Sequence, residues 1–384
     1  STTSRWTIDI AGGEQMTCSF LHLCSGYYDY DAGYTPDFPG AAEFQGRVVH
    51  PQQWSDDVDY ANKRVVVIGS GATAVTLVPE LAKHAAHVTM LQRSPTYIMS
   101  VPAMDPIAKK LRARLSEQRA YSATRWKNVL LSMAFYQWCR RFPGHAKRVL
   151  VNQVRKALGD HALVAEHFTP TYKPWDQRLC FVPDGDMFEA IKAGRASVVT
   201  DHIETFTPTG IRLRSGAELP ADLVVTATGL RLRVFGKIAI EVDGEPIDPG
   251  KTMVYRGMMC SDIPNFAFSV GYTNASWTLK CDLTSRFVCR LINHMDAQGY
   301  TKVWPKRDPR VEEQPLIDFS SGYVLRAVRD LPKQGSIVPW KLYQNYALDV
   351  MMIDRGRLDD GILQWATSAA RSTSPSTARA SRQP

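Results

Sequence analysis

The chain lacks the features that mark membrane-spanning, disulfide-stabilised and metal-binding proteins. No apolar run reaches the ~18 residues that a membrane-spanning helix needs. The seven cysteines are odd in number and include no C-x-x-C pair, and the nine histidines show no metal-ligand spacing. We therefore expect scattered reduced thiols, no metal site and a cytoplasmic location.

The composition is that of a globular protein with an uneven distribution of charge. With 384 residues, 44% of them hydrophobic, the chain is long enough for two domain-sized cores. Residues 109–156 contain 13 Lys or Arg and one acidic residue, Glu117, so this segment carries +12 against +8 for the whole chain, and the rest carries −4. Apolar residues within the segment recur at three- and four-residue spacing, which predicts helices.

The clearest motif is a dinucleotide-binding turn, Gly69-x-Gly71-x-x-Ala74. It follows the β-branched run 65–68, which suits a buried parallel strand, and it precedes an apolar helix. Gly69 allows a tight turn, Gly71 lets the backbone approach a pyrophosphate, and Ala74 lets the helix pack closely on the strand. The phosphates would lie at the N-terminus of that helix. The predicted binding residues of the turn are Gly69, Ser70, Gly71, Ala72, Thr73 and Ala74.

The residues after the next predicted strand, 87–91, indicate which dinucleotide is bound. An NAD site would place Asp or Glu there, about 20 residues past the glycines, to accept a hydrogen bond from the ribose 2′-hydroxyl. This chain has no carboxylate at that place. Arg93 offers a guanidinium fork for a 2′-phosphate and Ser94 a hydroxyl donor, so we expect NADPH rather than NADH. A solvated arginine at a strand end is the alternative.

A second signature, Phe44-x-Gly46-x-x-x-His50-x-x-x-Trp54, comes directly before the turn. The pair resembles the fingerprint of the Baeyer–Villiger class of flavoprotein monooxygenases. The resemblance implies that this motif is the linker between a flavin domain and an NADPH domain, and that His50 acts through hinge geometry or cofactor positioning. It also implies that Trp54 separates this class from the N- and S-oxidising flavin monooxygenases. Ser55 departs from the family, where Pro or Asp is usual.

The order of further segments extends the resemblance to about residue 360, where it is closest to the ethionamide-activating FAD-containing monooxygenases. The segments that carry it are 23–28, 64–74, 91–97, 175–180 and 272–278. The implied fold is an α/β flavoprotein with two dinucleotide-binding domains, Rossmann-like FAD and NADPH domains, and a helical insert in the NADPH domain. The implied cofactors are FAD and NADPH.

The implied domains are a remnant of the FAD domain with the linker at 1–60 and an NADPH-binding domain at 61–207. The latter carries the basic helical insert at about 105–165. Residues 208–365 return to the FAD domain and form the C-terminal region, and 366–384 are expected to be a disordered tail. Because the FAD-binding glycine turn of the family is expected upstream of Ser1, we interpret the sequence as N-terminally truncated.

Four residues are expected to bind FAD or lie near the flavin. Gly26 ends the strand predicted over 16–24, and Gly229 closes the Ala-Thr-Gly end of the strand 223–229, an element that the family also carries. Asn274 and Trp277 precede an apolar helix predicted over 279–295. Asn274 or Ser276 is expected to cap that helix, whose N-terminus suits the electron-rich side of a reduced flavin. The alternative is a helix cap beside a packed tryptophan.

Arg178 is the expected catalytic residue. The resemblance places at this position an arginine that reaches over the flavin. Because arginine keeps its proton at working pH, it can stabilise a peroxyflavin anion and the alkoxide that follows. Related members carry Lys directly before this arginine, and this chain has Gln177 there. The substitution puts in doubt how strongly this position helps to hold NADPH. A structural salt bridge is the alternative for Arg178.

The implied reaction inserts one oxygen atom from O₂ into a ketone through a C4a-peroxyflavin, giving an ester or lactone, and also oxidises sulfur compounds. Two alternatives remain: a truncated nucleotide-binding remnant without oxygenase activity, and an N- or S-oxidising flavin monooxygenase. For the basic segment 109–156, steering of NADPH with packing at the substrate entrance is favoured. Peripheral membrane contact comes second, and nucleic-acid binding is disfavoured because no such motif accompanies the charge.

Overall fold

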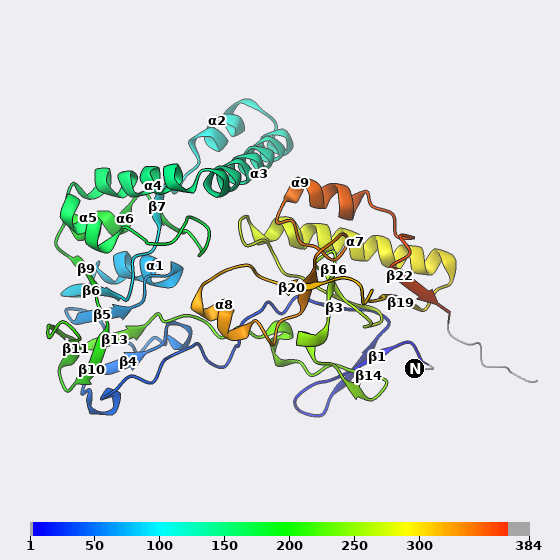
Figure 1. Cartoon of the computed structure of the whole chain (residues 1–384), viewed down its shortest axis with the longest axis horizontal. Coiled ribbons are helices and arrows are strands. Elements are labelled where there is room, and N and C mark those ends of the chain that lie inside the picture. The colour runs from blue at the N-terminus through cyan, green and yellow to red at the C-terminus, as the bar shows by residue number, and fades with distance from the viewer. Residues whose placement is uncertain (1–2, 368–384) are drawn as a thin grey trace, which may run out of the picture.

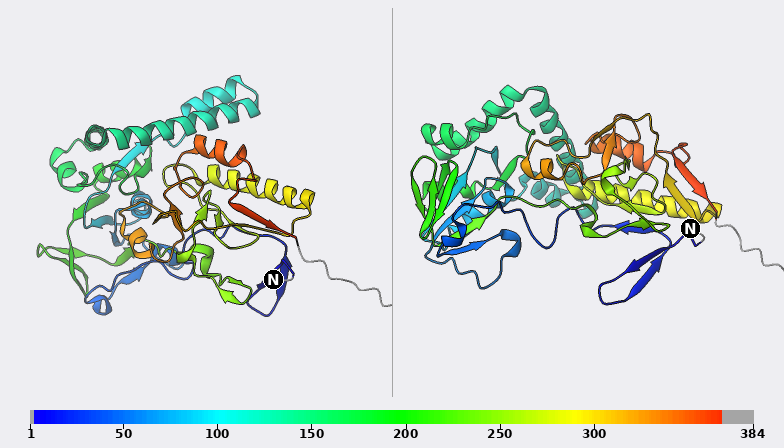
Figure 2. Two further views of the ribbon diagram at one scale, coloured as in Figure 1. Left: turned by 45° about the vertical axis from the view of Figure 1, so that its right-hand side comes forward. Right: turned by 60° about the horizontal axis from the view of Figure 1, so that its bottom comes forward.

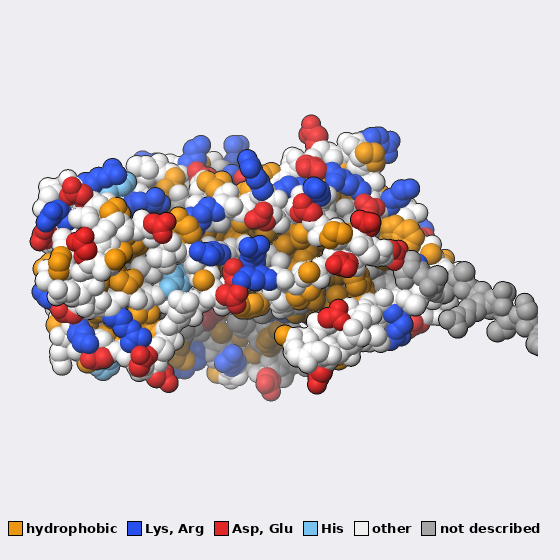
Figure 3. Space-filling model, turned by 90° about the horizontal axis from the view of Figure 1, so that it is seen from below, with side chains coloured by type: hydrophobic (Ala, Val, Ile, Leu, Met, Phe, Trp, Pro, Cys, Tyr) orange, Lys and Arg blue, Asp and Glu red, His pale blue; other side chains and the backbone are white. Residues whose placement is uncertain are grey.

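The computed structural model describes residues 3–367 and has two lobes (Figure 1). One lobe is built on a five-stranded parallel sheet, and the other surrounds the long helix α7 (Trp277–Gln298). Seen from below, the surface is hollowed near its middle, where Lys and Arg side chains lie beside hydrophobic ones (Figure 3). Of the predicted tail, residues 368–384 lie outside the described residues.

The parallel sheet confirms the α/β prediction. It has the spatial order β4-β13-β5-β6-β9, and every neighbouring pair is parallel. Its strands are β4 (Arg47–Val49), β5 (Arg64–Ile68), β6 (His87–Gln92), β9 (Ala196–Thr200) and β13 (Leu223–Thr226). Strand β5 lies between β6, which follows it in the chain, and β13, which returns on its other side. Such a switch in strand order is where open parallel sheets bind their ligands.

Both faces of β5 are covered, which explains its uninterrupted β-branched sequence. Val65 and Val67 share a core with the buried residues of α1 (Ala72–Leu81) and α6 (Asp186–Lys192). Val66 packs on the opposite face with Phe206 and Ile211. These two residues belong to an antiparallel sheet of β10 (Ile203–Thr207), β11 (Gly210–Leu213) and β12 (Glu218–Pro220).

The basic segment forms helices, as its periodicity predicts. The four helices of this region are α2 (Pro106–Arg114), α3 (Glu117–Arg141), α4 (Pro143–Leu158) and α5 (His161–His167). Helices α3 and α4 run along one side of the molecule (Figure 2). In α3, the guanidinium of Arg125 contacts Asp282 and the hydroxyl of Tyr346 at 3.0 Å each, and Trp126 packs 5.8 Å from the ring of Tyr346. The insert therefore contacts the α7 lobe directly.

The stretch 16–24 forms two strands, so the prediction of one strand over this stretch is wrong. Strand β2 (Gln15–Cys18) pairs antiparallel with β1 (Trp6–Asp9), whereas β3 (Leu21–Leu23) pairs parallel with β18 (Phe266–Phe268). Asn265 causes the division: its side-chain amide donates to the carbonyl of Ser19, and its own carbonyl accepts from Leu21 N–H.

The remaining elements connect and cover these two centres. The strands are β7 (Ile98–Val101), β8 (Cys180–Pro183), β14 (Glu241–Val242), β15 (Glu245–Pro246), β16 (Val254–Tyr255), β17 (Met259–Cys260), β19 (Lys302–Pro305), β20 (Glu313–Pro315), β21 (Lys333–Gly335) and β22 (Leu363–Ala366). The helices are α8 (Gly322–Ala327), which lies between the lobes (Figure 1), and α9 (Tyr346–Asp349).

All seven cysteines are free, as their spacing predicts. Within residues 3–367, none of the helices has the length and apolar character needed to cross a bilayer.

Candidate functional site

The glycine turn lies at the carboxyl end of β5 and leads directly into α1. Gly69 has φ +128°, and a Cβ there would lie 2.3 Å from the carbonyl oxygen of Ala227, so no other residue fits. At Gly71, by contrast, a Cβ would meet no atom within 4 Å. Because Gly71 also leaves the first amides of α1 without a side-chain cap, the turn presents free N–H groups to open space, which suits a pyrophosphate. Ala74 is fully buried beneath it.

Arg93 and Ser94 follow β6 at the same edge of the sheet, and both are exposed. The side chain of Arg93 makes no hydrogen bond or ion pair with any described residue. The hydroxyl of Ser70 lies 2.7 Å from that of Thr96, so it is engaged within the protein. Ala72 and Thr73 are exposed at the start of α1.

His50 is the member of the linker motif that reaches this edge. Its Nδ1 accepts a hydrogen bond from Gln52 N–H (3.1 Å), so the ring proton lies on Nε2, which donates to the carbonyl of Gly229 (3.2 Å). The ring packs against Gly33, where a Cβ would come within 1.9 Å of it. Burial lowers the pKa of His50, and the hydrogen bond to Gly229 opposes that shift.

The other three residues of the motif make packing contacts. Phe44 is buried with its ring centroid 5.9 Å from that of Phe206. A Cβ on Gly46 would lie 2.4 Å from the Phe44 ring, which explains the glycine. Trp54 contacts Tyr60 edge-on at 5.9 Å. None of the three lines the cleft that Arg178 enters.

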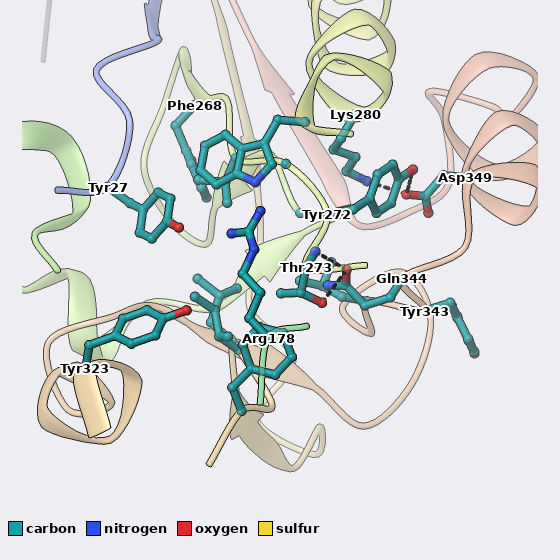
Figure 4. Close-up of a pocket in the computed structure, with 18 residues that line it drawn as sticks. Tyr27, Arg178, Phe268, Tyr272, Thr273, Lys280, Tyr323, Tyr343, Gln344 and Asp349 are labelled. Atoms are coloured by element: carbon teal, nitrogen blue, oxygen red, sulfur yellow. Dashed lines mark hydrogen bonds and ion pairs between the residues drawn. The ribbon is translucent and has the colours of Figure 1, made fainter. Parts of the chain in front are cut away.

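Arg178 points into a cleft between the lobes (Figure 4). The cleft is partly open to solvent, and most of the residues that line it are aromatic or aliphatic. Tyr27 and Trp277 form one wall, with ring centroids 4.8 Å apart and planes 24° from parallel. Arg178 makes no hydrogen bond or ion pair with any residue in 3–367, so the structural salt bridge considered for it is absent there.

Two tyrosine hydroxyls face this guanidinium, from Tyr27 and from Tyr323 of α8 (Figure 4). Burial raises the pKa of both phenols, and the positive charge of Arg178 opposes the shift. Both tyrosines therefore keep their protons at neutral pH and can donate hydrogen bonds into the cleft.

The loop that carries Arg178 is fixed from two sides. Trp175 has φ +71° and is buried against Tyr136 of α3, 5.5 Å away. The Asp176 carboxylate pairs with Arg140 of α3 at 3.0 Å. Its carbonyl accepts a hydrogen bond from Ser320 N–H at 3.0 Å, just before α8. Arg178 is therefore held at the junction of the insert, the lobe of the parallel sheet and α8.

A buried polar cluster at the far end of the cleft was not predicted from the sequence. Lys280, 5% exposed, pairs with Asp349 at 2.8 Å, and the Tyr272 hydroxyl donates to the same carboxylate at 2.6 Å. Burial lowers the pKa of Lys280, and Asp349 opposes that shift. The contacts join residues 69 and 77 positions apart, so no local pattern could have revealed them.

Of the four residues expected near the flavin, not all lie at the cleft. Trp277 lines the cleft, and Gly26, with φ +73°, directly precedes Tyr27. Gly229 lies instead at the sheet edge under His50. Asn274 turns away: its amide donates to Gln344 O at 2.9 Å, and its buried Oδ1 has no partner among the described residues.

Ser276 is the N-cap residue of α7, but the expected capping bond from Asn274 or Ser276 is absent. The Ser276 hydroxyl lies 2.8 Å from that of Thr278 instead. The start of α7 thus keeps its amides without a side-chain cap.

These features fit two nucleotides to different extents. The turn, Arg93 and the start of α1 suit a phosphorylated dinucleotide. The cleft suits a flat aromatic ring because aromatic side chains line it and the unpaired Arg178 lies in it, beside the Lys280–Asp349 pair. The described residues hold one Gly-x-Gly-x-x-Ala turn, so a second pyrophosphate has no such turn among them. No group of three or more His, Cys, Asp or Glu in residues 3–367 could hold a metal ion.

Fold and site together define a two-lobed α/β protein with a glycine turn suited to a dinucleotide. Residues 2–117 match the family model described as flavin-binding monooxygenase-like. The chain is 54% identical over 372 residues to the FAD-containing monooxygenase EthA of Mycobacterium tuberculosis, covering 96% of this chain and 76% of that protein. It is 46% identical to the probable FAD-binding monooxygenase AlmA of Acinetobacter baylyi, covering 94% and 74%. The chain belongs to this family of FAD-containing monooxygenases, as predicted.

Solved structures show the same fold. An oxidized steroid monooxygenase bound to NADP superposes with a TM-score of 0.69 at 21% identity, covering 95% of this chain and 78% of that one. The open crystal structure of cyclohexanone monooxygenase gives a TM-score of 0.65 at 18% identity, covering 95% and 77%. The predicted two-domain flavoprotein fold is thereby confirmed.

Proposed function

We propose that this flavin monooxygenase uses FAD, NADPH and O₂ to insert one oxygen atom into ketones, giving esters or lactones, and to oxidise sulfur compounds. Family membership supports FAD, and related folds crystallised with FAD and NADP support the pair of cofactors. The observation that carries the Baeyer–Villiger reaction is Arg178, an unpaired guanidinium directed into an aromatic cleft.

NADPH would bind at the carboxyl edge of the parallel sheet. The amides of residues 69–74 would hold its pyrophosphate, with Gly71 allowing the close approach. Arg93 and Ser94 would hold the 2′-phosphate. The absence of a carboxylate after β6 removes the group that would select NADH.

The flavin ring of FAD would lie in the cleft. Tyr27 and Trp277 supply aromatic surface, Gly26 allows the turn before Tyr27, and the uncapped start of α7 favours negative charge near the ring. Asn274 would act by fixing the segment before α7 through Gln344. Gly229 would act at the sheet edge, where its carbonyl accepts the hydrogen bond from His50.

The residues of the cleft perform three tasks. Bound, reduced FAD supplies the electrons that activate O₂. Arg178 stays charged and stabilises the negative charge that develops on oxygen as the ketone carbonyl is attacked. The protonated hydroxyls of Tyr27 and Tyr323 add hydrogen-bond donors. Apolar lining residues, including Leu316 and Phe319, limit the access of water.

We further propose the domain division inferred from the sequence, 1–60, 61–207 with the insert at about 105–165, and 208–365, with β4 and β13 from the outer two parts completing the sheet of the middle one. In the insert, Arg125 and Arg140 are paired with Asp282 and Asp176. The remaining positive charge would steer the anionic dinucleotide. Exposed apolar side chains on the same helices, such as Leu130 and Leu131, support membrane contact as the second proposal.

Oxygen labelling tests the reaction. The purified protein, supplied with FAD and NADPH, is incubated with a long-chain methyl ketone under oxygen-18 gas, and products are analysed by mass spectrometry. We expect an ester with one labelled atom. A thioether assayed in parallel should give the labelled sulfoxide.

The alternatives give different results. Sulfoxide without ester would assign the protein to the N- and S-oxidising type. NADPH oxidation that yields only hydrogen peroxide would contradict the oxygen-transfer proposal. Binding of NADP⁺ without any oxidation would indicate a nucleotide-binding protein without oxygenase activity.

A further inference from the structure

Arg326 of α8 lies over the ring of Tyr34, with its guanidinium carbon 3.5 Å from the centre of the ring. This is a close cation–π contact, which fixes the orientation of the guanidinium while leaving its N–H groups free. No described residue accepts a hydrogen bond from the Arg326 side chain or forms an ion pair with it. An exposed arginine with a fixed position and no acidic partner is suited to bind an anion.

The position of Arg326 relative to the sheet indicates which anion this is. Its Nη2 lies 3.7 Å from the place where a Cβ on Gly229 would stand. Gly229 follows β13, which pairs with β5 so that Thr226 is opposite Ile68. The carboxyl ends of β5 and β13 therefore meet below Arg326, beside the glycine turn.

Arg93 follows β6 on the other side of β5. Partial burial lowers the pKa of the Arg326 guanidinium, Tyr34 opposes that shift, and the charge of Arg93 adds to it. Two unpaired cations thus flank one turn of free amides. An anion between them would relieve their mutual repulsion.

We propose that Arg326 binds the pyrophosphate of NADPH from the β13 side of the turn, opposite Arg93. This inference rests on the proposed NADPH-dependent function and adds a residue that the glycine motif does not contain. Tyr34 acts as its positioning residue, because its N–H donates to Gly229 O (3.0 Å), the carbonyl that His50 also contacts.

Helix α8 then joins the two sites. Tyr323 and Arg326 are three residues apart, about one turn, so they share a face of the helix. Tyr323 faces Arg178 in the cleft, and Arg326 faces the nucleotide edge. A shift of α8 on nucleotide binding would move the Tyr323 hydroxyl relative to Arg178.

Equilibrium binding of NADP⁺ and NAD⁺, measured by calorimetry, tests the proposal. Both ligands carry the pyrophosphate, and only NADP⁺ carries the 2′-phosphate. Arg326→Gln should weaken both about tenfold, the loss of one charge-assisted phosphate contact. Arg93→Gln should weaken NADP⁺ alone. Arg329→Gln removes the same charge nearby and should leave both affinities within about twofold.

Two further variants separate position from charge. Arg326→Lys keeps a point charge without the planar fork and should lose less affinity than Arg326→Gln. Tyr34→Leu keeps Arg326 but removes its platform and should weaken both ligands, whereas Tyr34→Phe should not. Circular dichroism checks the fold of each variant.

The outcomes distinguish this inference from the proposed function. Unchanged affinity in Arg326→Gln, with NADP⁺ still dependent on Arg93, overturns the inference and leaves NADPH use standing. Weakening of NADP⁺ alone by Arg326→Gln overturns the pyrophosphate assignment. Failure of the unaltered protein to bind NADP⁺ removes the function on which the inference rests.

Discussion

His50 and Gly229 are 179 residues apart in the chain, yet Nε2 of His50 donates a hydrogen bond to the carbonyl of Gly229 across 3.2 Å. His50 precedes β5, and Gly229 follows β13. The same carbonyl accepts the N–H of Tyr34. One peptide group therefore fixes the segments that enter and leave the nucleotide lobe, beside the turn at Gly69. This contact gives the linker motif a physical explanation.

The pH dependence of the free energy of unfolding should reflect the protonation of His50. Burial lowers the pKa of His50 in the folded chain below its unfolded value near 6.5, and the pKa values of His22 and His167 shift the same way. As pH falls through about 6.5, the unfolded chain takes up protons first, so the free energy of unfolding decreases. Urea denaturation from about pH 7.5 to about pH 5.5 should show this loss, with a smaller slope for His50→Gln. Identical slopes would refute the assignment to His50.

Arg178→Ala should separate flavin reduction from oxygen transfer. Reduction by NADPH should stay within about threefold, whereas labelled ester should fall at least about 100-fold, the usual effect of removing one donor that stabilises developing charge. Stopped-flow absorbance measures the first step and mass spectrometry the second. The charge-matched control is Arg214→Ala, which removes an exposed arginine between β11 and β12. Retained ester formation in Arg178→Ala would remove Arg178 from the mechanism.

Gly271→Ala should damage the cleft wall. A Cβ there would lie 2.1 Å from Trp277 Cγ and 2.5 Å from its Cα, so Trp277 or the backbone must move. We expect a loss of roughly 1–3 kcal/mol in unfolding free energy and a changed tryptophan fluorescence. Gly144→Ala is the control: a Cβ in α4 meets no atom within 4 Å, and alanine should stabilise the helix by about 0.5–1 kcal/mol. Equal behaviour of the two variants would contradict the packing argument.

Lys280→Met should destabilise the protein strongly, because Asp349 would keep a buried charge without its cation. Breaking such a pair from one side costs roughly 3–5 kcal/mol. The double variant Lys280→Met/Asp349→Asn removes the charge as well and should recover more than half of that loss. Urea denaturation of the four proteins in this cycle measures the coupling. Additive losses would show that the pair does not act as a unit.

Local patterns along the chain were sufficient for β5, the glycine turn and the basic helices, but not for the whole sheet, because β4 and β13 come from outside 61–207. The run 65–68 had to be a buried strand, and the glycine spacing had to be a turn, because each depends on neighbours in sequence. The periodicity of 109–156 likewise predicted helices. The stretch 16–24 was misread because Asn265, 246 positions from Ser19, decides where one strand ends and the next begins.

By itself, the sequence determined the α/β class, the glycine turn after β5, the basic helices and the family, since these rest on local spacing or on the order of motifs. Only the tertiary structure decided what surrounds each functional side chain. It brought the Arg178 guanidinium to face Tyr27 and Tyr323, turned Asn274 away, buried Lys280 against Asp349 and set Arg326 on Tyr34. The physical reason is that these contacts join residues far apart in the chain. Long-range packing between the lobes, and no local propensity, fixes them.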